Sequence, residues 1–271
     1  MRARSLAAEG RERLSAAGIE SPAFDAEYLV RSVAGIDRAA YFLNPELSDE
    51  TVCQVRSAVA RRSAREPAAY VTGVREFWGL PIAVGPGVLV PRPETELLVE
   101  LAIGESNGSD VIVDVGTGSG CVAVAVSREL EGARVVAVDV SAEALAFASL
   151  NARRHAPEVA LVRGDLANAV FSASIILANL PYIATDEIDA LEPEVSRWEP
   201  RVALDGGGDG FDLVRRLVSD CAVRLRPRLL ALEVGYGMAP AACSIVEEHR
   251  ATATVHRDLA GVDRVVCARW Q

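Results

Sequence analysis

The chain has 271 residues, half of them apolar, and its 28 basic and 38 acidic side chains give a formal net charge of −10. This much apolar material supports a packed core of one large or two smaller domains and excludes a fully disordered chain. The acidic balance argues against binding nucleic acid by bulk charge. No apolar run approaches the roughly 18–20 residues that cross a bilayer.

Five cysteines, at positions 53, 121, 221, 243 and 267, are odd in number and include no Cys-x-x-Cys pair. They predict neither a disulfide framework nor a structural zinc site, and they indicate a reducing compartment. The start of the chain carries a charge every few positions and lacks the apolar stretch of a secretion signal. We therefore expect a cytoplasmic protein.

The charge is uneven along the chain, because residues 1–75 carry a net +1 and residues 76–271 carry −11. The apolar pattern changes at the same place. We predict three parts: a helical domain over 1–75, a β-hairpin linker over 76–90 and an α/β domain over 91–271.

The first part has the apolar spacing of a small helical bundle. Helices are expected over residues 4–17, 22–33 and 49–66, the last of them capped by Ser48. We interpret the Arg-rich stretch 61–67 as a solvated helix end rather than a nucleic-acid site, because the block is close to neutral.

From residue 76 the pattern becomes that of an α/β protein. After the hairpin and a helix over 93–106, strand-like and helical segments alternate, which predicts a doubly wound, mainly parallel sheet. The last twenty residues or so indicate two further strands around a Gly turn. Buried strands are expected at 111–116, 134–140, 159–165, 175–181 and 229–234, and helices at 121–130, 141–155 and 209–225.

A glycine-rich loop follows the first of these buried strands. Its glycines let the backbone turn sharply and approach a ligand closely. A dinucleotide fingerprint would need a glycine where Cys121 stands, and a pyrophosphate favours a helix start free of carboxylates, whereas an acid just before the loop suits a cationic ligand. The candidate cofactor-binding residues here are Asp114, Gly116, Thr117, Gly118, Ser119 and Gly120.

Two more acids end the next two strands. Asp139 lies 19 residues after Gly120, where a carboxylate can accept both hydroxyl hydrogen bonds of a ribose. Asp165 lies where an acid can meet an adenine amino group. Each feature alone is common in α/β folds, but three strand-end acids around a glycine loop fit a nucleoside that carries a sulfonium. We predict S-adenosylmethionine as the cofactor and S-adenosylhomocysteine as the product.

The run Asn179-Leu180-Pro181-Tyr182 ends the fourth strand, beside the glycine loop of a doubly wound sheet. The Asn179 side-chain oxygen and the Leu180 backbone carbonyl can accept both hydrogens of an NH2 group and aim its lone pair at a methyl donor. Pro181 fixes the turn, and Tyr182 offers a flat face to an amide or a base. We predict Asn179, Pro181 and Tyr182 as catalytic residues, all four as substrate-binding residues, and Asn179 also as a cofactor contact.

With these motifs the chain resembles the HemK/PrmC family, the protein-glutamine N5-methyltransferases that modify peptide chain release factors. The likeness covers nearly the whole chain. It implies a class I (Rossmann-like) S-adenosylmethionine-dependent methyltransferase, whose seven-stranded sheet has an antiparallel last strand, and a helical domain over 1–75 that helps recognise the substrate. The motifs are GVREFWGL (73–80), PRPETE (91–96), DVGTGSG (114–120), NLPY (179–182), EPRVALDGGGDGFD (199–212), LEVGYG (232–237) and DLAGVDRVV (258–266).

The resemblance also implies roles. The target is the glutamine of a Gly-Gly-Gln motif, and the partner is a release factor. Residues 116–120 resemble the cofactor loop, Asp139 the ribose-binding acid, and residues 179–182 the clamp for the substrate amide; Leu166 stands where the family can stack an adenine. The family's usual clamp is NPPY, so Leu180 is a departure, although its carbonyl can still accept. Met238 is a milder one, since a polar residue often stands there.

Arg92 and Glu94 open a helix after the hairpin, and two interpretations stay open for them: helix-start chemistry and contact with the substrate. The expected reaction is a one-step, in-line displacement that needs neither a metal nor a covalent nucleophile. We see no dedicated general base.

Three other functions stay open. An rRNA adenine N6-methyltransferase explains NLPY but not PRPETE, and the −11 charge of residues 76–271 disfavours duplex RNA. A diverged relative that methylates another amide or amino group, in a small molecule or another protein, explains Leu180. A non-catalytic cofactor-binding module leaves Asn179, Pro181 and Tyr182 unexplained. We expect a monomer with no direct contact with nucleic acid or membrane.

Overall fold

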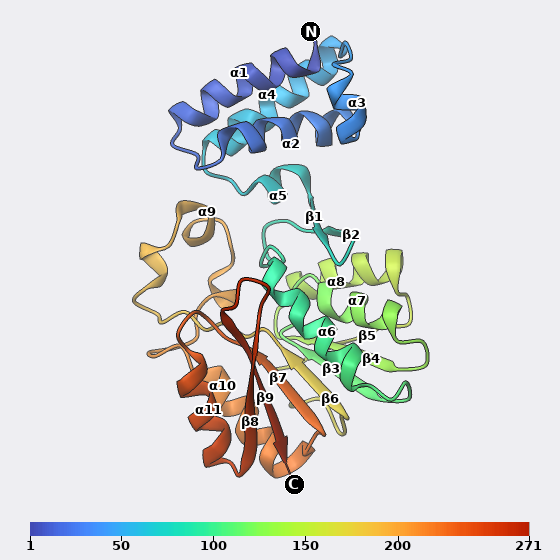
Figure 1. Ribbon diagram of the computed structural model, residues 1–271, viewed down its shortest axis with the longest axis vertical. Helices are drawn as coiled ribbons and strands as arrows, with labels where there is room; N and C mark the ends of the chain where they lie inside the picture. The colour runs from blue at the N-terminus through green and yellow to red at the C-terminus, as the bar shows by residue number, and fades with distance from the viewer. Residues whose placement is uncertain (271) are drawn as a thin grey trace. The chain divides into compact units, whose positions relative to one another are not determined.

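The computed structural model describes residues 1–270, which form two compact units (Figure 1). The first unit consists of Met1–Val74 together with a short later segment, Glu192–Trp198. The second consists of Arg75–Leu191 and the chain from Glu199 onward. No feature of the sequence indicated that the segment 192–198 belongs with the N-terminal helices.

The first unit is a helical bundle around a core of aliphatic side chains such as Leu6, Leu14, Leu29 and Val55. Ser48 caps its helix as expected, by accepting a hydrogen bond from the Thr51 backbone N–H. Two short helices, α3 and α5, were not expected. The helices are α1 (Ala3–Ala16), α2 (Pro22–Ala34), α3 (Arg38–Phe42), α4 (Asp49–Ser63), α5 (Ala68–Thr72) and α9 (Pro193–Ser196).

The interpretation of residues 61–67 as a solvated helix end is wrong. Arg62 is only 8% exposed, and its guanidinium contacts Asp25 Oδ2 at 2.7 Å and Glu194 Oε1 at 2.8 Å. Arg65 reaches the other oxygen of Glu194 at 2.7 Å. A local charge count could not show this network, because Glu194 lies 132 residues from Arg62 in the sequence.

A two-stranded hairpin, β1 (Val74–Phe77) and β2 (Leu80–Ala83), follows the N-terminal helices and, except for Val74, belongs to the second unit. This hairpin is shorter than the linker expected over 76–90, and residues 84–92 form an irregular loop instead of a strand. The pair Gly85-Pro86 and the later Pro91 interrupt the strand pattern in that stretch.

A seven-stranded sheet forms the centre of the second unit, as expected, in the order β5-β4-β3-β6-β7-β9-β8. Strands β3 to β7 run parallel, and β9 is antiparallel to both of its neighbours. Its strands are β3 (Val111–Val115), β4 (Arg134–Asp139), β5 (Ala160–Arg163), β6 (Ile175–Ala178), β7 (Leu229–Glu233), β8 (Ala251–Arg257) and β9 (Asp263–Trp270).

Helices cover both faces of this sheet, with α6, α7 and α8 on one side and α10 and α11 on the other (Figure 1). Helix α11 was not expected. The helices are α6 (Glu96–Glu105), α7 (Cys121–Glu129), α8 (Ala142–His155), α10 (Asp212–Asp220) and α11 (Ala239–Glu248); a π-helical turn (Cys221–Leu225) extends α10, and 3-10 turns lie at Pro93–Thr95, Ile188–Ala190 and Arg201–Ala203.

Strands β6 and β7 are buried along their whole length, because helices pack on both sides of them. The parallel strands end at one edge of the sheet, where the loops that follow β3, β4, β5 and β6 come together. Within residues 1–270, no helix is both long and apolar enough to cross a membrane.

Candidate active site

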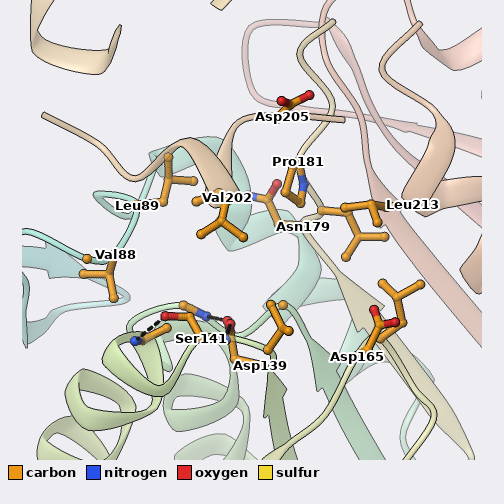
Figure 2. Close-up of a pocket in the computed structure, with 18 of the residues that line it drawn as sticks. Val88, Leu89, Asp139, Ser141, Asp165, Asn179, Pro181, Val202, Asp205 and Leu213 are labelled. Carbon is orange, nitrogen blue, oxygen red and sulfur yellow. Dashed lines mark hydrogen bonds between the residues drawn. The ribbon is translucent and has the colours of Figure 1, made fainter. Parts of the chain in front are cut away.

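A cavity of about 380 Å³ opens at the carboxyl edge of the parallel strands. Its size falls within the roughly 300–1,000 Å³ of small-molecule sites. Figure 2 shows Asp139 and Ser141 on one side of it, with Leu89, Pro181 and Val202 across from them. The cavity is lined by residues 87–89, Gly116, Gly118, residues 139–141, Ala144, residues 164–166, residues 179–181, Val202, Ala203, Asp205 and Leu213.

The glycine loop presents two of its predicted residues, Gly116 and Gly118, to the cavity. Gly116 has a φ of +74°, and a Cβ atom there would lie 3.3 Å from Leu180 Cδ2, so the loop packs closely against the Asn179–Tyr182 turn. Gly120 begins α7. Thr117 and Ser119 are buried and turn away from the cavity lining among the described residues.

Asp114 also points into the protein interior, with 3% of its surface exposed. Its Oδ2 accepts hydrogen bonds from the Thr117 hydroxyl at 2.5 Å and from the Ala123 backbone N–H at 3.2 Å. Burial raises the pKa of Asp114 to about 6, although both hydrogen bonds oppose the change. Through these two hydrogen bonds, Asp114 connects the glycine loop to the start of α7.

Asp139 lines the cavity at the end of β4. Its Oδ2 accepts from the Gly118 backbone N–H at 2.9 Å, and its Oδ1 accepts from the Ser141 backbone N–H at 2.8 Å. A carboxylate has about four acceptor positions, so each oxygen keeps one for a ligand. The carboxylate is therefore held rigidly and can still accept two hydroxyl groups.

Asp165 and Leu166 line the cavity after β5. Asp165 Oδ2 pairs with Arg216 at 2.5 Å, and both side chains are half exposed. Leu166 has a φ of +51°, which is a strained conformation for a residue with a branched side chain. In this conformation Leu166 forms part of the cavity wall.

The turn after β6 places Asn179, Leu180 and Pro181 on the cavity. The Asn179 Nδ2 group donates to the Thr95 hydroxyl at 3.1 Å. The Leu180 side chain is 3% exposed and fills space beside Gly116. Tyr182 stands next to the cavity lining; burial raises the pKa of its phenol, and a Cβ atom on Gly235 would lie 3.1 Å from its ring.

Arg92 and Glu94 lie outside this cavity among the described residues. Arg92 Nη2 donates to both oxygens of Glu199, at 2.9 and 2.8 Å, and Glu199 is only 6% exposed. Burial raises the pKa of Glu199, and the Arg92 charge opposes this. Glu94 borders a separate hollow together with Arg257 and Leu259.

Several residues that line the cavity were missed. Val88 and Leu89 come from the irregular loop after the hairpin, Val202 and Asp205 come from the segment between β6 and α10, and Leu213 lies in the first turn of α10. These are mostly apolar residues in irregular structure, where periodicity gives no signal. Ser141, which caps α8, carried one weak signal, since it follows a strand-end acid by two positions.

Comparisons with known proteins cover both units. The model of the PrmC N-terminal domain matches residues 5–73, and the model of the methyltransferase small domain matches residues 93–193. The release factor glutamine methyltransferase of Geobacter sulfurreducens is 38% identical over 262 residues, which cover 94% of this chain and 92% of that protein. The release factor glutamine methyltransferase of Cereibacter sphaeroides is 42% identical over 265 residues, which cover 95% and 94%.

Solved structures resemble the fold at lower identity. A methyltransferase from Pyrococcus furiosus superposes with a TM-score of 0.54 at 15% identity, covering 79% of this chain and 96% of that one. At this identity the likeness concerns the fold alone.

Proposed function

Because the chain belongs to the family of release factor glutamine methyltransferases, we propose that it transfers a methyl group from S-adenosylmethionine to the side-chain amide nitrogen (N5) of glutamine in the Gly-Gly-Gln motif of a peptide chain release factor. One observation carries the proposal beyond the family likeness. Asn179 and Leu180, which can accept both hydrogens of an NH2 group, border the same cavity as Asp139 and the glycine loop.

The residues of the cavity fit the cofactor. When bound, S-adenosylmethionine supplies a methyl group already activated by a sulfonium. Asp139 would accept the ribose hydroxyls with the two acceptor positions that Gly118 and Ser141 leave. Gly116 and Gly118 would let the ligand approach the backbone closely, and Leu166 would pack against the adenine. Asp165 would meet the adenine amino group with the oxygen that Arg216 does not hold.

An amide nitrogen is a poor nucleophile, because its lone pair is shared with the carbonyl group. Catalysis therefore depends on orientation, which can contribute on the order of 7 to 11 kcal/mol when reactants are held well. Hydrogen bonds from the substrate NH2 to Asn179 Oδ1 and to the Leu180 carbonyl strengthen as positive charge develops on the nitrogen. Pro181 holds the turn, Tyr182 lies beside the amide plane, and one nitrogen proton leaves to solvent.

We assign substrate recognition to the helical unit, and we propose a cytoplasmic monomer that uses no metal and has no direct contact with nucleic acid. The five cysteines, none of which forms a disulfide within residues 1–270, support a reducing compartment. The −11 charge of residues 76–271 supports a protein substrate over duplex RNA.

The test is to incubate the purified protein and labelled S-adenosylmethionine with a release factor, with ribosomes and with cell extract, and then to locate the label by mass spectrometry. We expect label on the glutamine of the Gly-Gly-Gln motif. Label on a ribosomal adenine, with none on a glutamine, would overturn the proposal in favour of an RNA methyltransferase.

A further inference from the structure

Two residues outside the cavity lie directly behind Asn179. Thr95, at the junction of the 3-10 turn and α6, is 3% exposed. Its hydroxyl oxygen accepts a hydrogen bond from Asn179 Nδ2 at 3.1 Å. Glu233, the last residue of β7, is also 3% exposed, and the neighbouring Thr95 hydroxyl lowers the pKa of its carboxyl group against the larger effect of burial. The motifs PRPETE and LEVGYG thus meet at Asn179.

The sheet register explains why these residues meet. Ala178 of β6 is paired with Leu232 of β7. Side chains alternate along a strand, so the residues that follow, Asn179 and Glu233, point to the opposite face of the sheet. Helix α6 covers this face over β6 and β7. Thr95 therefore stands above the neighbouring strand ends, between the two side chains.

A hydroxyl has a single hydrogen, which gives the chain of hydrogen bonds a direction. Since the Thr95 oxygen accepts from Asn179, its own hydrogen is left for the neighbouring Glu233 carboxyl group. An amide group is planar, so holding Nδ2 against Thr95 turns Oδ1 away from it. Without Thr95, the two ends of the Asn179 amide could exchange places and present a donor to the substrate NH2.

We propose that Thr95 and Glu233 are positioning residues that fix the Asn179 amide with its oxygen toward the substrate; this inference rests on the proposed function of Asn179. Burial is the main reason that the pKa of Glu233 is raised to about 7, and its Oε2 has no hydrogen-bond partner among the described residues. A buried carboxyl without full pairing is costly to keep for stability alone.

The first test compares Thr95→Val, which keeps the shape and removes the hydroxyl, with Thr95→Ser, which keeps the hydroxyl. We expect Thr95→Val to lower kcat on a release factor at least tenfold and to keep the Kd of S-adenosylhomocysteine within twofold of the wild-type value. Thr95→Ser should keep kcat within threefold of the wild-type value. Thr252→Val, an exposed position on β8, is the matched control and should leave kcat unchanged.

A second readout does not depend on the substrate. In 15N-labelled protein, hydrogen exchange of the Asn179 side-chain amide should be faster in Thr95→Val than in the wild type. Wild-type kcat and wild-type exchange in Thr95→Val would together overturn the inference. A wild type that does not methylate a release factor would overturn the proposed function instead, and the exchange comparison would still decide whether Thr95 holds Asn179.

Glu233→Gln covers the case in which Thr95→Val does not fold. An ionised Glu233 only accepts, which keeps the Thr95 lone pair for Asn179, so wild-type kcat should rise with pH through about 7. The glutamine variant should lower kcat and lose this rise; an unchanged pH profile would overturn the role of Glu233. The charges of Arg264, Glu94 and Arg92 influence the pKa of Glu233, and the charge of Glu233 in turn influences the pKa values of Tyr182 and Cys121.

Discussion

Asn179 is the residue on which the proposed chemistry depends most. Asn179→Ala removes the side-chain acceptor for the substrate NH2, while Asp139 and the glycine loop keep their hydrogen bonds. We expect kcat to fall at least a hundredfold, because an error of orientation at the reacting nitrogen has effects of that size. The Kd of S-adenosylhomocysteine, measured by calorimetry, should change less than threefold.

Asn168→Ala is the matched control for that substitution, because Asn168 is exposed and lies outside the cavity lining. It should leave both kcat and Kd unchanged. Near-normal turnover of Asn179→Ala would refute the assignment of Asn179 as the amide clamp.

Asp114 makes the stability of the fold depend on pH. Its pKa is raised by burial from 3.8 to about 6, so the folded state binds this proton more tightly than the unfolded chain does. The resulting stabilisation is complete below about pH 4 and is lost as the pH rises through about 6. We expect the free energy of unfolding of Asp114→Asn, relative to wild type, to rise by about 2 kcal/mol between pH 4 and pH 7.

Asp110→Asn is the control with the opposite sign. A hydrogen bond from Arg228 lowers the pKa of Asp110 to about 2, so its stabilisation is present above about pH 4 and is lost only below it. The difference between Asp110→Asn and wild type should stay nearly constant from pH 4 to pH 7. Urea unfolding at pH 4 and pH 7 measures the free energy of unfolding of both variants. Equal pH dependence of the two would contradict the opposite pKa shifts of Asp114 and Asp110.

At the residue scale, the sequence predicts where chemical groups occur but not where they point. Asp139 ends a strand, Asp165 and Asn179 follow strands, and all three border the cavity. Asp114 also belongs to a strand end, yet it points beneath the loop. The direction depends on pleat alternation and on partners such as Thr117, which composition and spacing do not reveal.

At the scale of elements, the loop 206–210 supports the turn that carries the clamp. Gly210 has a φ of +79°, and a Cβ atom there would collide with the Tyr182 backbone carbonyl. Gly208, two positions away, has open space around it. We expect Gly210→Ala to lower the free energy of unfolding by about 2 kcal/mol or more and to reduce kcat, because the turn must move.

Gly208→Ala, the matched control, should stay within about 0.5 kcal/mol of the wild type with unchanged kcat. Denaturant unfolding and turnover on a release factor measure both variants. Equal stability of the two would show that the close approach at Gly210 does not constrain the turn.

The Arg62 network is the second element-scale feature with a measurable effect. Arg62→Ala removes the cation that the mostly buried Asp25 and Glu194 share. Asp25 loses this partner while Glu194 keeps Arg65, so we expect a loss of about 3 kcal/mol, the low end for buried ion pairs. Arg56→Ala, on the same helix, breaks the solvent-exposed pair with Glu9 and should cost much less stability, because solvent screens exposed ion pairs. Hydrogen exchange of peptides within residues 49–63 measures how much each substitution destabilises this helix. Similar protection in the two variants would contradict the larger effect expected for Arg62→Ala.

Strong periodicity made most elements of the α/β unit predictable, including β3, β4, β6 and β7. Helix α11 was missed although Pro240 in its first turn is a start signal, because Met238 before it forms no side-chain cap. The short helices α3, α5 and α9 are too brief to show a 3.6-residue period.

At the scale of the whole molecule, the distribution of negative charge and the division into two units are both consistent with methylation of a protein substrate. The excess of acid lies beyond residue 75, in the part of the chain that holds the cavity, while the helical bundle is nearly neutral. The fold class was predictable from the alternation of strands and helices. The return of residues 192–198 to the helical unit was not, because the contact joins distant parts of the sequence.

The central claim is that this site methylates the amide nitrogen of one glutamine. The most direct measurement is mass spectrometry of peptides from a release factor after reaction with S-adenosylmethionine, compared with a release factor in which glutamate replaces the glutamine of Gly-Gly-Gln. The account predicts one methyl group on the glutamine side chain and none on the glutamate variant. Equal methylation of both proteins, or a methyl group on another residue, would contradict it.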